Sequence, residues 1–362
     1  MLDVAVHSLC FHHDGGFALR DVTLTFRQSA HTAVVGPPAC GASTLLRLIA
    51  GALKPASGDV IFGQRRVNDV KAAQRPALFT TSAIDVPGRW TVQHALVAAV
   101  RTRALDRHDR HREYSLAAEQ WELVPLLERR VDSLSSTERA RVHLARIELL
   151  RPAILLADRL LESVSASARS SLADRFYRTM RILGTTVISA PSSRDELAFT
   201  EGIVVLEDGS VVQEGNVAEI FAQPIDDAAA IATGDVDLVP ITIRGSVVES
   251  VIGSWEVNAP FQGGGVAIVR PSHFTRASAG EDSDFVFGVE EAGFAEGRWI
   301  ARGVLSGGVA LRVELPAEEN VYKGRLLAMR YDPRRFRLIE RVMTPLRVGV
   351  PTDIVPPLAE TR

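Results

Sequence analysis

A strand-like run, a glycine-bearing loop and an apolar helix follow one another early in the chain, and they constrain its fold most. Residues 34–51 read VVGPPACGASTLLRLIAG, in which four residues separate Gly36 from Gly41 and Ser43 opens the helical part. This spacing matches the phosphate-loop pattern G-x-x-x-x-G-K-[ST], whose glycines let the backbone curl around a phosphate at a helix N-terminus. The lysine position holds Ala42. The stretch predicts a nucleotide-binding fold that lacks a central part of its chemistry.

The composition is that of an ordinary globular protein with room for two domains. Of 362 residues, 46% are hydrophobic and 23% are charged,. A net charge of −3 predicts no nucleic-acid partner,. Two cysteines, Cys10 and Cys40, suggest no disulfide framework and fit a reducing compartment,. No signal peptide is visible and no run approaches the ~20 apolar residues that span a bilayer, so we expect a cytoplasmic protein that reaches a membrane only through a partner.

Strand-like and helical segments alternate over residues 1–235, which predicts an α/β domain,. The runs at 152–158 and 184–190 are short and apolar, as in strands of a sheet that is covered on both faces,. Apolar residues recur at helical spacing within residues 88–150,. We therefore expect a P-loop NTPase-type domain with a helical insertion.

The pattern changes near residue 236. Residues 236–342 read as short strands separated by glycine turns, without helical periodicity, which predicts a small all-β barrel domain,. Residues 343–362 are rich in proline and predict a loosely ordered tail,.

The order of these landmarks resembles the ATP-binding subunits of ABC importers, in the group with a C-terminal TOBE-like β-barrel domain. Besides residues 34–51, the resemblance rests on LSSTERARVHLARIELLRPAILLADR (134–159), IVVLEDGSVVQEG (203–215) and VAIVRPSHF (266–274). It covers nearly the whole chain and looks closest to ferric-iron, polyamine or phosphonate importers. It implies permease (transmembrane) subunits as partners, a homo- or heterodimer with an ABC ATPase subunit, and a place on the inner face of the cell membrane.

The resemblance also implies which residues meet ATP and Mg²⁺. His13, or else Phe11, would stack on adenine, and Ser135 would approach the nucleotide held by the other subunit of a head-to-tail dimer. Ser43 and Asp158 would hold Mg²⁺. The phosphates would lie on the loop formed by Gly36, Pro37, Pro38, Ala39, Cys40, Gly41, Ala42, Ser43 and Thr44.

Several positions that carry catalytic residues in the family hold other residue types here. The glutamine position is Thr80, the glutamate position is Arg159 and the switch-histidine position is Ser192. An arginine stays protonated and cannot act as a base. Loss of the loop lysine removes a charge-assisted hydrogen bond worth roughly 1.5–3 kcal/mol, so affinity for ATP should fall about ten- to a hundredfold. These changes predict a pseudo-ATPase, catalytically impaired.

The signature of the family, LSGGQ, is replaced by LSSTE. Ser136 and Thr137 stand where two glycines allow close approach to the partner's phosphate, and a β-branched Thr137 should tolerate unusual backbone angles poorly,.

Three functional interpretations stay open at this stage. The chain is a non-catalytic importer subunit, or a soluble regulatory or scaffold protein that kept only the fold, or a slow ATP-binding subunit in which Arg159 substitutes for the missing cation. Arg159 can instead form an ion pair with Asp158 or Glu162, which argues against the slow ATP-binding subunit. Membrane association separates the first from the second.

Overall fold

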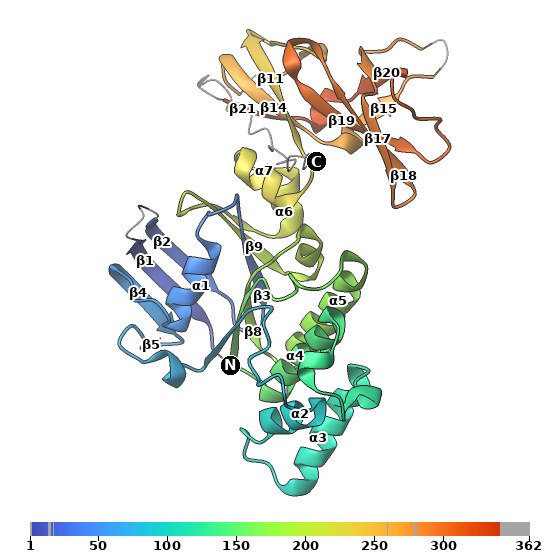
Figure 1. Cartoon of the computed structure of the whole chain (residues 1–362). Helices are drawn as coiled ribbons and strands as arrows, with labels where there is room; N and C mark the ends of the chain where they lie inside the picture. Colours follow the sequence, from blue (N-terminus) through green and yellow to red (C-terminus); the bar gives the residue numbers. More distant parts are fainter. Residues whose placement is uncertain (1, 14–15, 17, 259, 279–280, 341–362) are drawn as a thin grey trace, which may run out of the picture. The chain divides into compact units, whose positions relative to one another are not determined.

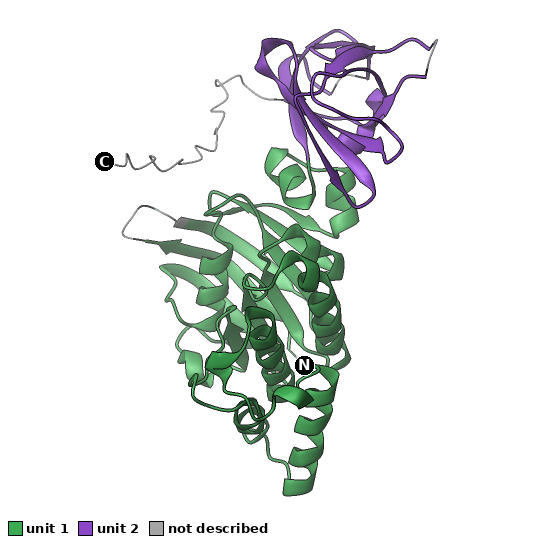
Figure 2. Ribbon diagram, turned by 45° about the vertical axis from the view of Figure 1, so that its right-hand side comes forward, with its two compact units in different colours: residues 1–235 green, residues 236–362 purple. Residues whose placement is uncertain are grey.

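A six-stranded, mostly parallel sheet forms the centre of the first of two units, Met1–Asp235 and Val236–Arg362 (Figures 1 and 2). The computed structural model describes residues 2–13, 16, 18–258, 260–278 and 281–340. The strand order is β10-β9-β3-β8-β7-β6, and every neighbouring pair except β9 and β10 is parallel. The strands are β3 (His31–Val35), β6 (Ala77–Thr80), β7 (Ile154–Asp158), β8 (Thr186–Ala190), β9 (Gly202–Glu207) and β10 (Ser210–Gly215).

A smaller antiparallel sheet packs against helix α1 (Ala42–Ala50), on the side of the helix that faces away from the parallel sheet. Its order is β2-β1-β4-β5, with strands β1 (Val4–His12), β2 (Ala18–Phe26), β4 (Ser57–Phe62) and β5 (Arg65–Arg66). Leu45 and Leu48 of α1 share one buried apolar cluster with Val60 of this sheet and Leu156 of β7. The helix that follows the glycine loop is therefore held between two sheets.

Four helices form a second core on the other side of the parallel sheet: α2 (Val92–Val100), α3 (Arg107–Gln120), α4 (Ser136–Leu150) and α5 (Ala166–Ile182). Trp121 is fully buried among them, and its Nε1–H donates to Glu148 Oε2 at 2.6 Å. The first unit also contains α6 (Val217–Ala222), α7 (Asp227–Thr233) and the short 3-10 helices η1 (Ala72–Gln74), η2 (Val124–Leu126), η3 (Val131–Ser133) and η4 (Arg194–Phe199). Among the described residues, no helix combines the length and the apolar character needed to cross a membrane.

The second unit is built from antiparallel sheets. A five-stranded sheet has the order β13-β12-β11-β14-β21, and two three-stranded sheets have the orders β15-β20-β16 and β17-β18-β19. Phe287, Val313 and Met329 are among its completely buried side chains. The strands are β11 (Asp237–Arg244), β12 (Val247–Ser250), β13 (Gly253–Glu256), β14 (Gly263–Val269), β15 (Phe274–Arg276), β16 (Phe285–Gly288), β17 (Glu291–Ala295), β18 (Arg298–Val304), β19 (Ala310–Pro316), β20 (Leu326–Tyr331) and β21 (Arg337–Glu340). The short 3-10 helices are η5 (Pro271–His273), η6 (Ser306–Gly308) and η7 (Pro333–Arg335).

The predicted succession of an α/β region and an all-β region is confirmed. Closure of the antiparallel sheets into a barrel stays a prediction. The proline-rich tail predicted for residues 343–362 lies outside the described residues.

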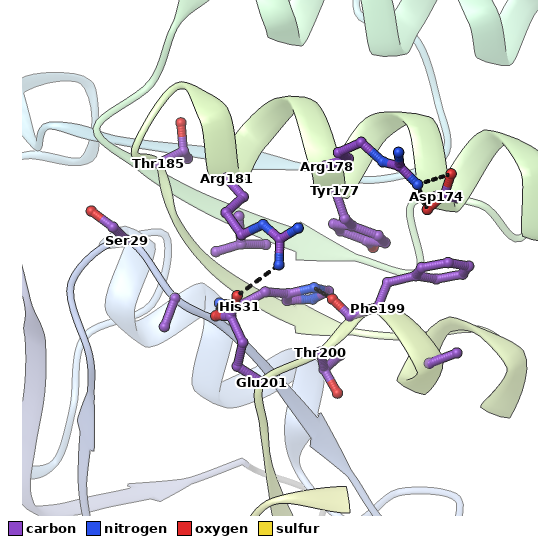
Figure 3. A pocket seen from close by; sticks show the side chains of 13 residues that line it. Ser29, His31, Asp174, Tyr177, Arg178, Arg181, Thr185, Phe199, Thr200 and Glu201 are labelled. Atoms are coloured by element: carbon purple, nitrogen blue, oxygen red, sulfur yellow. Dashed lines mark hydrogen bonds and ion pairs between the residues drawn. The ribbon is translucent and has the colours of Figure 1, made fainter.

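A cavity of about 220 Å³ lies at the start of β3, around the buried ring of His31 (Figure 3). The Nδ1–H of His31 donates to the carbonyl of Phe199 at 2.9 Å, and its Nε2 lies 2.8 Å from the hydroxyl of Ser189. The ring stacks on Tyr177 with 4.1 Å between centroids. Burial lowers the pKa of His31 to about 4. The ring is therefore a neutral, fully hydrogen-bonded part of the core.

We expect the first unit to lose stability as the pH falls from about 6.5 toward 4, because the unfolded chain then binds a proton that folded His31 excludes,. Each histidine shifted this far contributes about 3 kcal/mol, fully present above pH 6.5 and absent below pH 4,. Thermal unfolding measured at several pH values checks this. His31→Gln should flatten the dependence, whereas His108→Gln, at an exposed position of α3, should leave it unchanged. Equal profiles for wild type and His31→Gln would contradict the assignment.

Candidate functional site

The loop between β3 and α1 opens into a cavity of about 440 Å³ at the carboxyl ends of the parallel strands. Ligands of open parallel sheets bind at this edge, because loops and helix N-termini converge there. Besides Gly36, Pro37, Pro38, Cys40, Ala42 and Ser43 of the loop, the lining includes Arg159 after β7, Ser192 to Arg194 after β8, and Ile231 of α7. A second hollow of about 230 Å³ lies on the loop itself, over Ala39 to Thr44. The predicted phosphate loop thus lines two adjoining hollows.

The loop backbone is curled through glycine-type conformations. A Cβ on Gly36 would lie 2.0 Å from the carbonyl oxygen of Leu206, so only glycine fits there. Gly41 has φ 110°. Ala39 also adopts a positive φ of 66°, which strains a residue with a Cβ by about 1 kcal/mol,. The loop is therefore curled even where it carries an alanine.

Cys40 is a buried residue of the loop. Its N–H donates to Pro37 at 3.0 Å and its carbonyl accepts from Gly209 at 3.2 Å. The side chain is 8% exposed, and burial raises the pKa of its thiol. A protonated thiol is a weak nucleophile. Cys40 therefore anchors the loop to the turn between β9 and β10.

Ser43, which lines the cavity, is in contact with Asp158. The hydroxyl of Ser43 donates to Asp158 Oδ1 at 2.7 Å, and Asp158 Oδ2 lies 3.7 Å from the guanidinium of Arg47. The Asp158 side chain is only 5% exposed. A hydroxyl and a carboxylate in contact are the hard oxygen donors that Mg²⁺ prefers. The two residues that sequence analysis assigned to Mg²⁺ are thus brought together.

The first turn of α1 adds a site for an anion beside this pair. N–H groups at a helix N-terminus have no partner within the helix. The N-cap residue Gly41 has no side chain that could cap them. Ser43 and Thr44 lie in this turn, whereas the side chain of Ala42 is a methyl group that donates nothing. The backbone thus offers donors to a phosphate without the lysine that usually accompanies them.

Arg159 leaves β7 next to Asp158 and turns to Glu162. Its guanidinium lies 2.8 Å from Glu162 Oε1, and both side chains are about half exposed. Its own φ is 52°, and its N–H donates to Ala190 at 2.8 Å. Of the two acidic partners that sequence analysis considered, Glu162 is the one that Arg159 contacts, while Asp158 binds Ser43.

Ser192 lines the cavity but directs its polar groups into the protein. Its N–H and its hydroxyl donate to Glu196 Oε1 at 3.0 and 2.9 Å, and the N–H of Ser193 donates to the same oxygen at 3.3 Å. Glu196 is 1% exposed, and the hydroxyl of Tyr177 lies 3.4 Å from its other oxygen. Sequence analysis missed Glu196. Its signal was a capping pattern, Ser193 followed three residues later by Glu196,.

Thr80 ends β6 and is almost fully buried. Its hydroxyl lies 2.8 Å from Nε2 of His143, which also lies 3.0 Å from the carbonyl of Thr81. Burial lowers the pKa of His143 to about 4, so this ring is neutral near pH 7. Sequence analysis missed this contact, because its two residues lie 63 positions apart in the chain.

Ser135 caps α4, the helix that the signature motif opens. Its hydroxyl accepts from the N–H of Glu138 at 3.3 Å, and the carboxylate of Glu138 accepts from the N–H of Ser135 at 2.8 Å. Ser136 and Thr137 are the first residues of α4 and have ordinary helical angles. Thr137 therefore has backbone angles that a β-branched residue tolerates, while the effect of Ser136 and Thr137 on approach to a second subunit's phosphate stays a prediction.

His13 follows β1 and is exposed, with its ring 4.8 Å from that of Phe11 in an edge-to-face contact. Arg159, Ser192 and most of the loop residues therefore line one cavity, and Asp158 contacts one of its lining residues, Ser43. Thr80 lies on the neighbouring strand, while stacking by His13 and a role for Ser135 in a second subunit's site stay predictions. Sequence analysis also missed Arg47 and Arg194.

Comparisons with known proteins agree with this geometry. Residues 19–161 match the family model described as ABC transporter. The chain is 25% identical over 331 residues to the sn-glycerol-3-phosphate import ATP-binding protein UgpC 3 of Agrobacterium fabrum, which covers 89% of this chain and 93% of that protein. It is 28% identical over 235 residues to the maltose/maltodextrin import ATP-binding protein MalK of Salmonella typhimurium, a match that covers 64% of each chain.

A solved structure shows the same fold. The structure of cbiO1 from Clostridium perfringens, described as part of the ABC transporter complex cbiONQ, matches with a TM-score of 0.54 at 21% identity. The match covers 60% of this chain and 90% of that one. Together with the phosphate loop and the Ser43–Asp158 pair, these findings identify the first unit: the chain carries an ABC transporter ATP-binding domain.

Proposed function

We propose that this chain is the ATP-binding-type subunit of an ABC importer complex, and that it binds nucleotide weakly and does not hydrolyse it. It then serves as a structural or regulatory half, a pseudo-ATPase, beside permease subunits at the cytoplasmic face of the membrane. One observation carries the proposal. Ser43 and Asp158, the residues that would hold Mg²⁺, are in contact, while the loop has Ala42 at the lysine position and Arg159 follows Asp158.

The residues present fit a nucleotide with Mg²⁺. The curled loop and the first turn of α1 would hold phosphate through backbone N–H groups, as other helix N-termini do,. Ser43 and Asp158 would hold Mg²⁺, which, when bound, neutralises phosphate charge,. The missing lysine removes one charge-assisted interaction, worth roughly 1.5–3 kcal/mol. This supports weak rather than absent binding.

Hydrolysis needs a group that orients and deprotonates the attacking water. The side chain after Asp158 is the guanidinium of Arg159, which only donates hydrogen bonds,. Its partner Glu162 is about half exposed and already accepts from it at 2.8 Å. Thr80 and Ser192 bind His143 and Glu196. These contacts support loss of catalysis.

Two matched relatives are named as import ATP-binding proteins, one for sn-glycerol 3-phosphate and one for maltose or maltodextrin. The match to the first extends over 331 residues and so includes part of the all-β unit. We extend the importer role to this chain on that basis. Residues 236–342 are then a TOBE-like regulatory domain, and about 88–150 are the helical subdomain that faces the permeases. The chain pairs with itself or with a second ABC ATPase subunit.

Calorimetric titration with MgATP tests nucleotide binding. We expect Ala42→Lys to bind about ten- to a hundredfold more tightly than wild type, because the new ammonium reaches the phosphates. Ala104→Lys adds the same charge at an exposed residue outside the site and should leave affinity unchanged. Arg159→Gln should also change little, since Glu162 already binds this guanidinium. A large loss of affinity in Arg159→Gln would favour the alternative in which Arg159 replaces the lysine.

A phosphate-release assay tests the loss of catalysis. We expect the purified chain to release phosphate from MgATP no faster than its Asp158→Asn variant, because neither protein offers a base to the water. A steady rate in wild type that Asp158→Asn abolishes would contradict the pseudo-ATPase assignment.

Purification of the tagged chain from its own cells in mild detergent tests the importer role. We expect permease subunits to co-purify, with or without a second ATPase whose loop retains lysine. Mass spectrometry identifies them, and an untagged strain is the control. Recovery of the chain alone from the soluble fraction would favour the scaffold alternative.

A further inference from the structure

The cavity beside the loop offers little to a third phosphate group. Pro37, Pro38, Ala42, Pro191 and Ile231 form much of its wall. None of these side chains donates a hydrogen bond. Favourable contact with the terminal phosphate would therefore have to come from the few polar side chains at this end of the sheet.

The two hydroxyls expected at sensing positions are held elsewhere. Ser192 donates its N–H and its hydroxyl to the buried carboxylate of Glu196 at 3.0 and 2.9 Å. Thr80 lies 2.8 Å from the buried ring of His143. Both partners are at most 5% exposed. Turning either hydroxyl toward a nucleotide would break a hydrogen bond to a buried side chain, which costs free energy.

The two guanidinium groups of the lining are also paired. Arg159 lies 2.8 Å from Glu162 and Arg194 lies 2.9 Å from Asp235. Each pair is about half exposed and its net charge is zero. The positive field that a third phosphate requires is thus largely cancelled at both positions.

Contacts for the inner phosphates are, in contrast, in place. The loop has its curled backbone, α1 presents its uncapped first turn, and Ser43 and Asp158 lie in contact. These groups gather at the loop and its adjoining hollow of about 230 Å³.

We propose that the site recognises the diphosphate part of a nucleotide and does not distinguish a nucleoside triphosphate from a nucleoside diphosphate. This rests on the proposed function, since it presumes nucleotide binding. It adds that the subunit keeps the same nucleotide-bound form when the ATP around it is converted to ADP. A subunit that does not respond to ATP hydrolysis would keep the same conformation throughout the transport cycle of the complex.

The test is calorimetric titration of the full chain with MgADP and, separately, with MgATP. We expect the two dissociation constants to agree within about threefold, a difference smaller than one charge-assisted contact produces. Glu162→Gln releases Arg159 from its ion pair, so this variant should bind MgATP several-fold more tightly while its affinity for MgADP stays the same. Adding Arg159→Gln to Glu162→Gln should abolish that gain. Asp174→Asn breaks a comparable exposed pair with Arg178 on α5 and is the matched control.

Each outcome has a defined meaning. Equal affinities in wild type, with an ATP preference that appears in Glu162→Gln and not in Asp174→Asn, support the proposal. A preference of wild type for MgATP of about tenfold or more overturns it and leaves the proposed function standing. No heat with either nucleotide at millimolar concentration overturns it together with the nucleotide-binding part of the proposed function. An unchanged ratio in Glu162→Gln overturns the role given to the Arg159–Glu162 pair.

Discussion

The hydrogen bond between Ser43 and Asp158, 2.7 Å long, joins the two halves of the site. Ser43 lies in the first turn of α1 and Asp158 ends β7, so the bond sets the helix N-terminus against the carboxyl edge of the sheet. Leu45 and Leu48 of the same helix are fully buried. Because apolar packing fixes the helix on both sides, this polar contact is maintained in a partly buried place where a carboxylate alone would be costly.

Around this pair, the side chains at the positions expected to carry chemistry have partners within the protein. Thr80 binds His143, Ser192 binds Glu196 and Arg159 binds Glu162. Two of these partners are buried, so their contacts stabilise the first unit,. The same contacts support weak nucleotide binding and indifference to a third phosphate.

The motifs that differ from the family pattern still form the local structure that the fold needs. Ala39 adopts a positive φ that glycine would adopt without strain,. The LSSTE motif still opens α4, because Ser135 and Glu138 form a capping box,. Both observations explain how an ABC-type fold persists in a chain whose sequence departs from the family at several motifs.

The sequence by itself determined the fold class, the phosphate loop and the Ser43 and Asp158 positions, because local spacing and the order of motifs carry that information. It also showed that Arg159 cannot be a base, a property of the residue type. Only the tertiary structure decided which residues far apart in the sequence are in contact. His143 meets Thr80 across 63 positions of sequence, and Ser43 meets Asp158 across 115 positions. Such choices depend on which strands and helices lie side by side, and no local pattern encodes that.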